Sequence, residues 1–371
     1  TNALTFTLSP QAGDVDLDGV TVSSPIDLNG GTITDTKGNP LSSLTFTPPN
    51  TTNVKVNYPS LGMDFVYDAD GRYTLNGTAY NDLSSFLTAA GGTFTRASIG
   101  TYFDNAGVMQ TAASGTPRFD YDPVTHTAKG ILIEEARTNL LTYSAMSSLT
   151  GWSASSLSLL TVNNPGSLPV GATSCLRDEV ASGQTNGYTI KNVTLTSGAT
   201  YTYSAWVYVP SSVPATKAKL SAWYVNTGVW YGITSTVITE RDQWVRKTLT
   251  FTANATYAAH VIGIGVASAS PGDYTYGCLS QLEQGSFPTS YIPTTSTTVT
   301  RQADDLVIPT GSWLNGNTGT LFGEALAYNA TATIMNSASP TIATINMTSS
   351  NALARVGRYT ANTGFFQSQT A

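Results

Sequence analysis

The stretch KGILIEEARTNLLTYS, residues 129–144, places two adjacent carboxylates, Glu134 and Glu135, beside Arg137 in a chain that uses little charge. Two carboxyl groups can cleave a glycosidic bond when they face one cleft about 5 Å or about 6.5–9.5 Å apart. Adjacent residues of a β-strand point to opposite faces. If this stretch is a strand, its two glutamates cannot act on one bond, and a hydrolase is only the alternative interpretation.

The same region offers these carboxylates a structural role, because it contains several arginines. The planar guanidinium suits bidentate contacts with carboxylates in a compact, turn-rich segment. Such a network fixes geometry more than it adds net stability, and it can resemble a perturbed active site. We therefore expect a structural brace in preference to a catalytic centre. The predicted ion-pair residues are Arg96, Arg118, Glu134, Glu135 and Arg137, with Asp120 or Asp122 as further partners.

Aromatic side chains are the best candidates for ligand binding. Sugars stack on the faces of Trp and Tyr, while a few polar groups fix their orientation. Strand alternation predicts that one member of each adjacent aromatic pair lies in the core. Trp206 and Trp244 are expected inside, whereas for the second pair surface binding and core packing both remain open. The candidate carbohydrate-binding residues, on two expected strands joined by an NTG turn, are Trp223, Tyr224, Trp230 and Tyr231.

The string DVDLDG at residues 14–19 has the D-x-D-x-D-G spacing of a calcium loop. Asp14, Asp16 and Asp18 would supply the oxygen ligands, but Pro25 stands where the EF-hand needs its glutamate. The alternative is an acidic turn between two strands. Calcium is the one cofactor that the sequence suggests.

Cysteine and histidine offer little further chemistry. Cys175 and Cys278 are expected to be buried free thiols, with a single bridge as the alternative if their strands are neighbours. The two histidines, His126 and His260, are far apart in the sequence. The sequence therefore offers too few histidines to favour a His-based zinc site or a Ser-His-Asp triad.

The composition predicts an all-β protein. The 371 residues suffice for two or three domains, and only 11% are charged, against about 25% in typical soluble domains. Thr, Ser, Asn and 33 Gly suit strands and turns. A net charge of −6 without basic clusters argues against nucleic acid or anionic membranes as partners. No apolar stretch approaches the roughly 20 residues of a membrane span.

Four segments follow one another along the chain. Residues 1–59 alternate short strands and turns, residues 60–143 form a turn-rich connector, residues 144–300 contain seven strands at sandwich-like spacing, and residues 301–371 begin another module. Both end modules are expected to be partial, since the chain opens inside an expected strand. The connector contains the one predicted helix, NDLSSFLTAAGG. Asn81 or Asp82 would cap this helix, Leu83, Phe86 and Leu87 would share a face, and Gly91-Gly92 would end it.

Two long strings carry a resemblance to known families. FTRASIGTYFDNAGVMQTAASGTPRFDYDPVTHTAKGILIEEARTNLLTYS, followed by QLEQGSFPTSYIPTTSTTVTRQAD, resembles a composite of bacteriophage tail and virion-surface proteins. In that family a connector leads into a jelly roll similar to carbohydrate-binding modules, often followed by a concanavalin-A-like or laminin-G-like sandwich. LTFTLSPQAGDVDLDGVTVSSPIDLNGGTITDTKGNPL resembles the closing half of a bacterial immunoglobulin-like module. The resemblance thus implies serial β-sandwich modules: partial immunoglobulin-like, jelly roll and the start of a concanavalin-A-like one.

The resemblance also implies a function. We expect a non-enzymatic phage structural protein at the virion surface, a tail fibre, spike or head decoration, that adheres to host surface glycans. Other virion proteins would be its neighbours, and a homo-trimer is expected by analogy with fibres. Several copies per particle would multiply weak sugar binding. The alternatives are a depolymerase of capsular polysaccharide and a ligand-free spacer or capsid decoration, the latter predicting that Trp230 and Tyr231 are buried.

Overall fold

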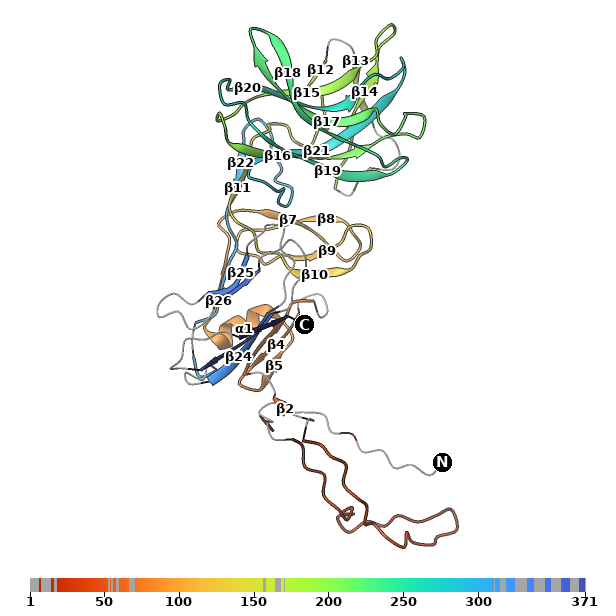
Figure 1. Ribbon diagram of the computed structural model, residues 1–371, viewed down its shortest axis with the longest axis vertical. Helices are drawn as coiled ribbons and strands as arrows, with labels where there is room; N and C mark the ends of the chain where they lie inside the picture. Colours follow the sequence, from red (N-terminus) through yellow and green to blue (C-terminus); the bar gives the residue numbers. More distant parts are fainter. Residues whose placement is uncertain are drawn as a thin grey trace.

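A computed structural model describes residues 7, 15–16, 19–52, 54, 56–57, 60–66, 71–155, 158–163, 168–169, 171–309 and 311–313, and five strands between 318 and 370. Antiparallel sheets dominate, and the described residues contain one short helix, which confirms the predicted all-β class. Within that part of the chain, no helix is long and apolar enough to cross a membrane. An N-terminal arm, a middle body and a β-sandwich follow one another along the longest axis of the molecule (Figure 1).

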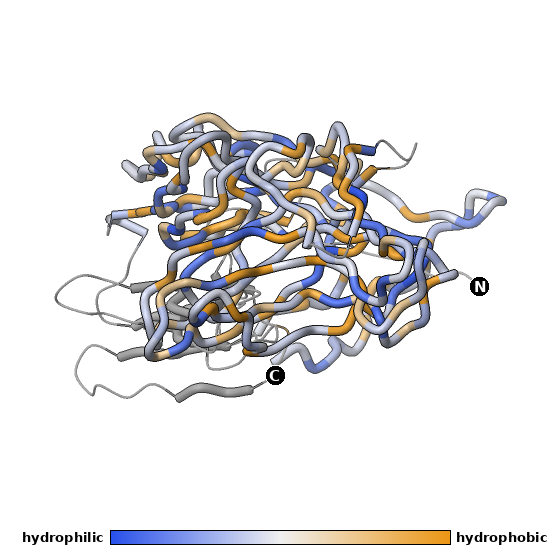
Figure 2. The backbone as a smooth tube through the Cα atoms, turned by 90° about the horizontal axis from the view of Figure 1, so that it is seen from above, coloured by the Kyte–Doolittle hydropathy of each residue, from blue (hydrophilic) through white to orange (hydrophobic). Residues whose placement is uncertain are grey.

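The largest unit is a sandwich of two five-stranded antiparallel sheets, where the sequence predicts seven strands. The sheet that we call distal has the order β12 (Ser153–Ala154), β15 (Gly187–Thr194), β20 (Ala259–Val266), β17 (Ala218–Asn226), β18 (Val229–Val237). The proximal sheet has the order β13 (Ser158–Asn163), β14 (Cys175–Val180), β21 (Tyr274–Gln284), β16 (Thr200–Tyr208), β19 (Trp244–Thr252). Hydrophobic stretches, in orange, alternate with hydrophilic ones along the backbone in Figure 2.

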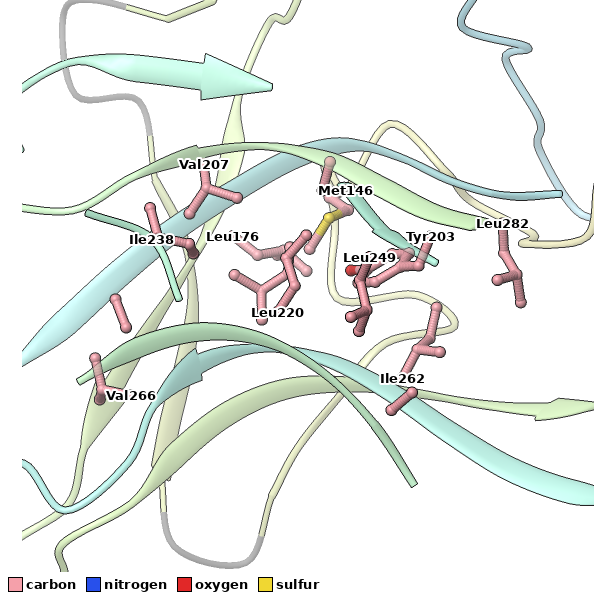
Figure 3. Close-up of a cluster of buried hydrophobic side chains, with 14 of the residues drawn as sticks. Met146, Leu176, Tyr203, Val207, Leu220, Ile238, Leu249, Ile262, Val266 and Leu282 are labelled. Atoms are coloured by element: carbon pink, nitrogen blue, oxygen red, sulfur yellow. The ribbon is translucent and has the colours of Figure 1, made fainter. Parts of the chain in front are cut away.

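The sandwich core lies between the two sheets. Alternate residues of each strand point inward, so one side of each sheet supplies apolar side chains to the interior. Each large apolar side chain that is fully buried contributes about 1.5–3 kcal/mol. The buried set in Figure 3 includes Met146, Leu176, Tyr203, Val207, Leu220, Ile238, Leu249, Ile262, Val266 and Leu282.

The connector is a body of short strands around one helix. Asp82 caps α1 (Leu83–Ala90) by accepting a hydrogen bond from the Ser85 amide at 2.8 Å, and Gly91 ends the helix at φ 64°. The predicted helix is therefore confirmed, with Asp82 as the cap. The helix buries Leu83, Phe86 and Leu87, as expected, against the fully buried Tyr73. The connector strands are β3 (Leu61–Asp64), β4 (Arg72–Leu75), β5 (Thr78–Tyr80), β6 (Thr93–Thr95), β7 (Gly100–Phe103), β8 (Met109–Ala112), β9 (Phe119–Tyr121) and β10 (Ala128–Ile131).

The chain enters and leaves the sandwich at one place. β11 (Arg137–Asn139) pairs with β22 (Val299–Arg301), and Arg137 lies opposite Arg301 in that pairing. The chain then returns to the connector, where β23 (Asp305–Val307) pairs with β6. The sandwich is thus an insertion in the connector. Pairing of β22 with β11 and of β23 with β6 holds residues 299–307 beside the connector.

The connector covers the outer face of the proximal sheet. Its Phe103 and Met109 pack on a buried cluster that includes Trp206, Cys175 and Cys278. The rings of Phe103 and Trp206 meet edge-on at 6.3 Å. Figure 1 shows β16, β21 and β19 between the distal sheet and the connector strands β7 and β8. The distal sheet therefore faces away from the connector.

The two ends of the chain contain smaller sheets. β1 (Val15–Asp16) pairs with β2 (Val56–Asn57), and an isolated bridge joins Thr34 to Pro40. The immunoglobulin-like interpretation of residues 1–59 stays a prediction. Near the other end, β24 (Thr318–Gly323), β27 (Arg355–Thr360) and β28 (Gln367–Thr370) form one sheet, and β25 (Ala332–Asn336) pairs with β26 (Thr344–Met347).

Candidate functional site

The paired glutamates lie in a segment without strand pairing, so the premise that this stretch is a strand is wrong. Residues 132–136 separate β10 from β11, and the Glu134 amide donates to the Asp304 carboxylate at 3.0 Å, where a strand would bond to a neighbouring strand. The two side chains nevertheless differ in their exposure to solvent. The Glu134 side chain is 11% exposed and the Glu135 side chain 57%.

Glu134 belongs to a buried ion-pair cluster that we call the arginine centre, formed by Arg96, Arg118, Glu134, Arg301 and Asp304. Arg96 Nη1 lies 2.9 Å from Asp304 Oδ1, and Arg118 Nη2 lies 2.5 Å from Asp304 Oδ2. Arg118 Nη2 also contacts Glu134 Oε2 at 2.8 Å, and Arg301 Nε lies 3.4 Å from that oxygen. All three arginine side chains are almost completely buried.

The arginine centre keeps the Glu134 carboxylate fully engaged. Burial alone would raise the pKa of Glu134, but the guanidiniums of Arg301 and Arg118 together with the hydrogen bonds from Ser290 lower that pKa. The amide and hydroxyl of Ser290 both donate to the carboxylate at 2.7 Å. Glu135 pairs separately with Arg137 at the surface. These contacts make the stretch a brace between the connector and the two ends of the sandwich, and they leave Glu134 without access to a substrate.

Sequence reasoning missed two members of this centre. Asp304 and Arg301 lie in the string TRQAD, which was used only as part of a family resemblance. The expected alternative partners have other roles: Asp120 accepts from the Phe103 amide at 2.8 Å, and Asp122 pairs with Lys129 at 3.3 Å. The missed signal was an arginine and an aspartate three residues apart, immediately after the sandwich.

The outer face of the distal sheet contains a shallow groove with a volume of about 350 Å³. Lys219, Ser221 and Trp223 project into it from alternate positions of β17, so they form one row on that face. Tyr188 borders the row across β20, whose Gly263 and Gly265 present no side chain between them. We call this site the distal groove, lined by Tyr188, Lys219, Ser221, Ala222, Trp223, Gly232, Ile233, Thr234 and Ser235.

Three aromatic rings meet along this groove. The ring of Tyr188 lies edge-on to that of Trp223 at 5.1 Å, and Trp223 lies 5.7 Å from Trp230. A Cβ atom at Gly263 would stand 3.2 Å from the Trp223 ring, so glycine at this position lets the ring reach across β20. The Tyr188 hydroxyl is hydrogen-bonded to Ser221, and burial raises the pKa of Tyr188, so the hydroxyl stays protonated.

The opposite face of the same hairpin carries a separate stack of three tyrosines. Tyr224 lies between Tyr231, at 5.0 Å and 13°, and Tyr257, at 5.4 Å and 2°. β17 and β18 are joined by Thr227-Gly228, both at positive φ, as in a type I′ turn. The turn and the stacked rings hold the hairpin in one geometry, so the edge of the distal groove is formed before any ligand arrives.

The four predicted aromatics therefore form two groups on opposite faces. Trp223 lines the distal groove, and Trp230 adjoins the groove through its ring contact with Trp223. Tyr224 and Tyr231 belong to the tyrosine stack. The expectation that one of each adjacent pair lies in the core is wrong, because this end of the hairpin lies outside the main buried cluster. Trp230 is 40% and Tyr231 41% exposed, contrary to what a ligand-free spacer predicts. Trp206 is buried, while Trp244 is half-buried against the same cluster.

The remaining candidates offer no chemistry in the described part of the chain. Cys175 and Cys278 are buried and free, and burial raises the pKa of Cys175 to about 12. Buried His260 accepts from the Asn254 amide at 3.0 Å and contacts the Ala258 carbonyl at 2.8 Å through its two ring nitrogens. The described residues contain no group of three or more metal-ligating side chains. Asp14 and Asp18 lie outside the described residues and Asp16 lies in β1, so calcium binding stays a prediction.

Comparisons with known proteins found similarities of fold. No family model matches the chain, and neither does a curated protein. The enzymatically active domain of bacteriophage CBA120 tailspike protein 4 is 9% identical with a TM-score of 0.31, over 39% of this chain and 21% of that one. The C-terminal family 22 carbohydrate binding module of Clostridium thermocellum Xyn10B is 13% identical with a TM-score of 0.32, over 38% and 91%.

A carbohydrate-binding module of the β-sandwich superfamily with promiscuous specificity is 13% identical with a TM-score of 0.34. That similarity covers 61% of this chain and 98% of the other. At these identities and scores, the likeness assigns no role to any residue of the chain.

Proposed function

We propose that the protein binds carbohydrate in the distal groove and does not cleave it. The observation that carries this proposal is the pair of tryptophan rings, Trp223 and the exposed Trp230, beside the polar side chains of Lys219, Ser221 and Ser235. A pyranose presents an apolar face that can stack on an indole ring, and its hydroxyl groups can bond to the polar side chains. An open groove also admits a polymer, which can extend beyond both ends.

The position of the groove supports this function. The outer face of the proximal sheet is covered by the connector through Phe103 and Met109, whereas the distal sheet faces away. The aromatic residues of the groove lie on strands and are held by ring contacts, so little conformational entropy is lost on binding. Catalysis finds no such support, because the residues lining the groove include no Asp or Glu.

The biological setting is part of the same proposal. The resemblance of the FTRAS and IEEARTNLL strings to phage virion proteins favours a location at the surface of a virion, in a fibre, spike or head decoration. Each site would bind weakly, and several copies on one particle would raise the avidity without new contacts. Immunogold electron microscopy of assembled particles tests this setting, and absence of label from every virion structure would rule it out.

The binding function is tested with two neighbouring substitutions. Trp230→Ala removes an exposed ring beside the groove, next to Trp223, and Tyr231→Ala removes an equally exposed ring from the opposite face. After a glycan array has identified a ligand, titration calorimetry should show at least a tenfold weaker affinity for Trp230→Ala, the size expected of a buried aromatic contact. Tyr231→Ala should bind like the unsubstituted protein.

Circular dichroism and thermal melting establish that both variants are folded. Equal losses of affinity in Trp230→Ala and Tyr231→Ala would show that the sugar does not bind in the distal groove. No binding of any glycan at millimolar concentration would reject the proposed function.

A further inference from the structure

The distal groove contains one charged residue, and that residue is positive. Lys219 is half-buried, and within the described part of the chain its ammonium group has no ion pair or hydrogen bond. The other groove residues are aromatic, aliphatic, hydroxyl-bearing or glycine. The whole chain, by contrast, has a net charge of −6. A lone cation in a groove of an acidic protein indicates a negatively charged ligand group.

Two other lysines of the sandwich strands have internal partners. Lys247 pairs with Glu240 at 2.6 Å, and Lys191 donates to the Thr142 and Gly151 carbonyls at 3.0 and 2.6 Å. Lys219 lies near the start of β17, opposite Gly265 of β20 and Val237 of the edge strand β18. Neither of these neighbours can accept a bond through its side chain. The unused donors of Lys219 are therefore free for a ligand.

The aromatic and charged positions of the groove lie close enough for one sugar chain to contact both. Lys219 and Trp223 are four residues apart on one face of β17, so their backbone positions are about 13 Å apart. The Trp223 ring lies 5.1 Å from the ring of Tyr188, and Tyr188 and Lys219 are both opposite Gly265 of β20. Adjacent units of one oligosaccharide can therefore contact the tryptophan and the lysine. Ser221 lies between the two positions and can bond to the connecting units.

We propose that the distal groove selects an acidic oligosaccharide, in which one unit stacks on the tryptophans and another presents an anionic group to Lys219. This inference rests on the proposed sugar-binding function and adds the charge of the ligand to it. The anionic group is a carboxylate, as in a uronic acid, or a sulfate. An ammonium–anion hydrogen bond is stronger than a neutral one, so Lys219 supplies selectivity while the tryptophans supply general affinity.

Matched pairs of probes test the proposal on the full chain. Uronic-acid oligosaccharides are compared with their methyl esters, and sulfated oligosaccharides with their desulfated forms, so that each pair differs in charge but keeps its rings. Titration calorimetry should show about tenfold tighter binding of the charged member of at least one pair, as expected for one charge-assisted contact. Which pair discriminates identifies the anionic group.

Two lysine variants assign the selectivity to its residue. Lys219→Met should remove the preference for the charged member and keep the affinity for the neutral one. Lys37→Met removes the same charge from an exposed position in the N-terminal arm and should change neither. Trp230→Ala should weaken both members of the pair equally.

The outcomes separate this inference from the function on which it rests. If neutral and charged members bind equally and both depend on Trp230, the groove binds sugars but the inference is overturned. If Lys219→Met keeps the full preference, the charge is recognised elsewhere and the inference is likewise overturned. If neither member of any pair binds, the proposed function and the inference both fail.

Discussion

Neighbouring residues of this chain have very different energetic roles. Glu134 and Glu135 are adjacent and chemically identical, yet Glu134 is held by two buried arginines, whereas Glu135 has an exposed side chain that pairs with Arg137. Removing one partner of a buried pair leaves a charge uncompensated, whereas exposed pairs contribute little. The sequence showed that carboxylates and arginines were both present. It could not show that Asp304 would complete the cluster, because Arg96 and Asp304 are 208 residues apart.

Asp178 is a buried carboxylate that no sequence pattern indicated. It is 1% exposed and faces the interior of the sandwich, where the Ser158 hydroxyl donates to Oδ2 at 3.0 Å. Its other oxygen, Oδ1, has no hydrogen-bond partner among the described residues. Burial raises the pKa of Asp178 from 3.8 to about 7. The folded protein therefore binds a proton here more tightly than the unfolded chain does.

The raised pKa of Asp178 predicts a loss of stability as the pH rises. Well below pH 3.8 the group is protonated in both states, and its full contribution is present; that contribution is lost as the pH rises to about 7. Asp178→Asn keeps the shape without the charge, so it should raise the free energy of unfolding at pH 8 by about 2–4 kcal/mol. Urea unfolding at pH 5 and pH 8 measures this effect.

Asp242→Asn is the matched control for that experiment. The Ser211 amide is the main cause of the lowered pKa of the exposed Asp242. Above pH 4, Asp242→Asn should therefore slightly lower the free energy of unfolding, whereas Asp178→Asn should raise it. An Asp178→Asn variant less stable than the parent at pH 8 would show that the ionised carboxylate is favourable.

At the scale of elements, nearby residues in the sequence were sufficient to predict short elements such as the helix and the hairpin turn. Asp82 and Gly91 bound the helix, and the Thr227-Gly228 turn joins β17 to β18, both from cues within a few residues. The direction of the hairpin aromatics was not predictable in this way. A bulge between Ala222 and Trp223 shifts the pairing with β18, and the hairpin lies at the sheet edge, where both faces can be exposed.

The glycines of the distal sheet illustrate how one strand shapes the groove of another. In Gly263→Ala the new methyl group would meet the Thr189 carbonyl oxygen at 3.1 Å and the Trp223 ring at 3.2 Å. The crowding should lower the free energy of unfolding by about 1–3 kcal/mol. Gly232→Ala places its methyl group 4.0 Å from the other side of Trp223 and should be neutral or stabilising by up to about 1 kcal/mol.

Thermal or urea unfolding of the two glycine variants provides the measurement. Near-UV circular dichroism should change more for Gly263→Ala, because the indole of Trp223 must move. Equal stability of the two variants would mean that the close approach at β20 relaxes without cost.

At the scale of the whole molecule, the connector and the sandwich act as one body. Phe103 packs on the cluster that contains Trp206 and both cysteines. Sequence spacing divided the chain into consecutive modules and did not indicate that the sandwich is inserted, because the pairing of β11 with β22 joins residues far apart in the chain. Composition could not reveal which outer face of the sandwich the connector covers.

The docking of the connector can be followed through thiol chemistry. Cys175 and Cys278 are completely buried, and burial raises the pKa of both, so they should react slowly with a disulfide reagent at pH 8. Phe103→Ala should increase the labelling rate at least several-fold by loosening the contact. Phe119→Ala, which belongs to the cluster around α1, should leave the rate unchanged. Equal rates in the two variants would indicate that opening of the sandwich itself controls access.

The pairing of Arg137 with Arg301 brings the two ends of a module of about 160 residues side by side. A module attached in this way works as a cassette, because its replacement alters neither the path nor the spacing of the chain that carries it. A sandwich with a different groove, spliced between residues 139 and 299, would keep the five residues of the arginine centre if it also supplied the Ser290 contacts to Glu134 and an apolar surface for Phe103. Recognition could then change by exchange of the cassette while the supporting architecture stays constant.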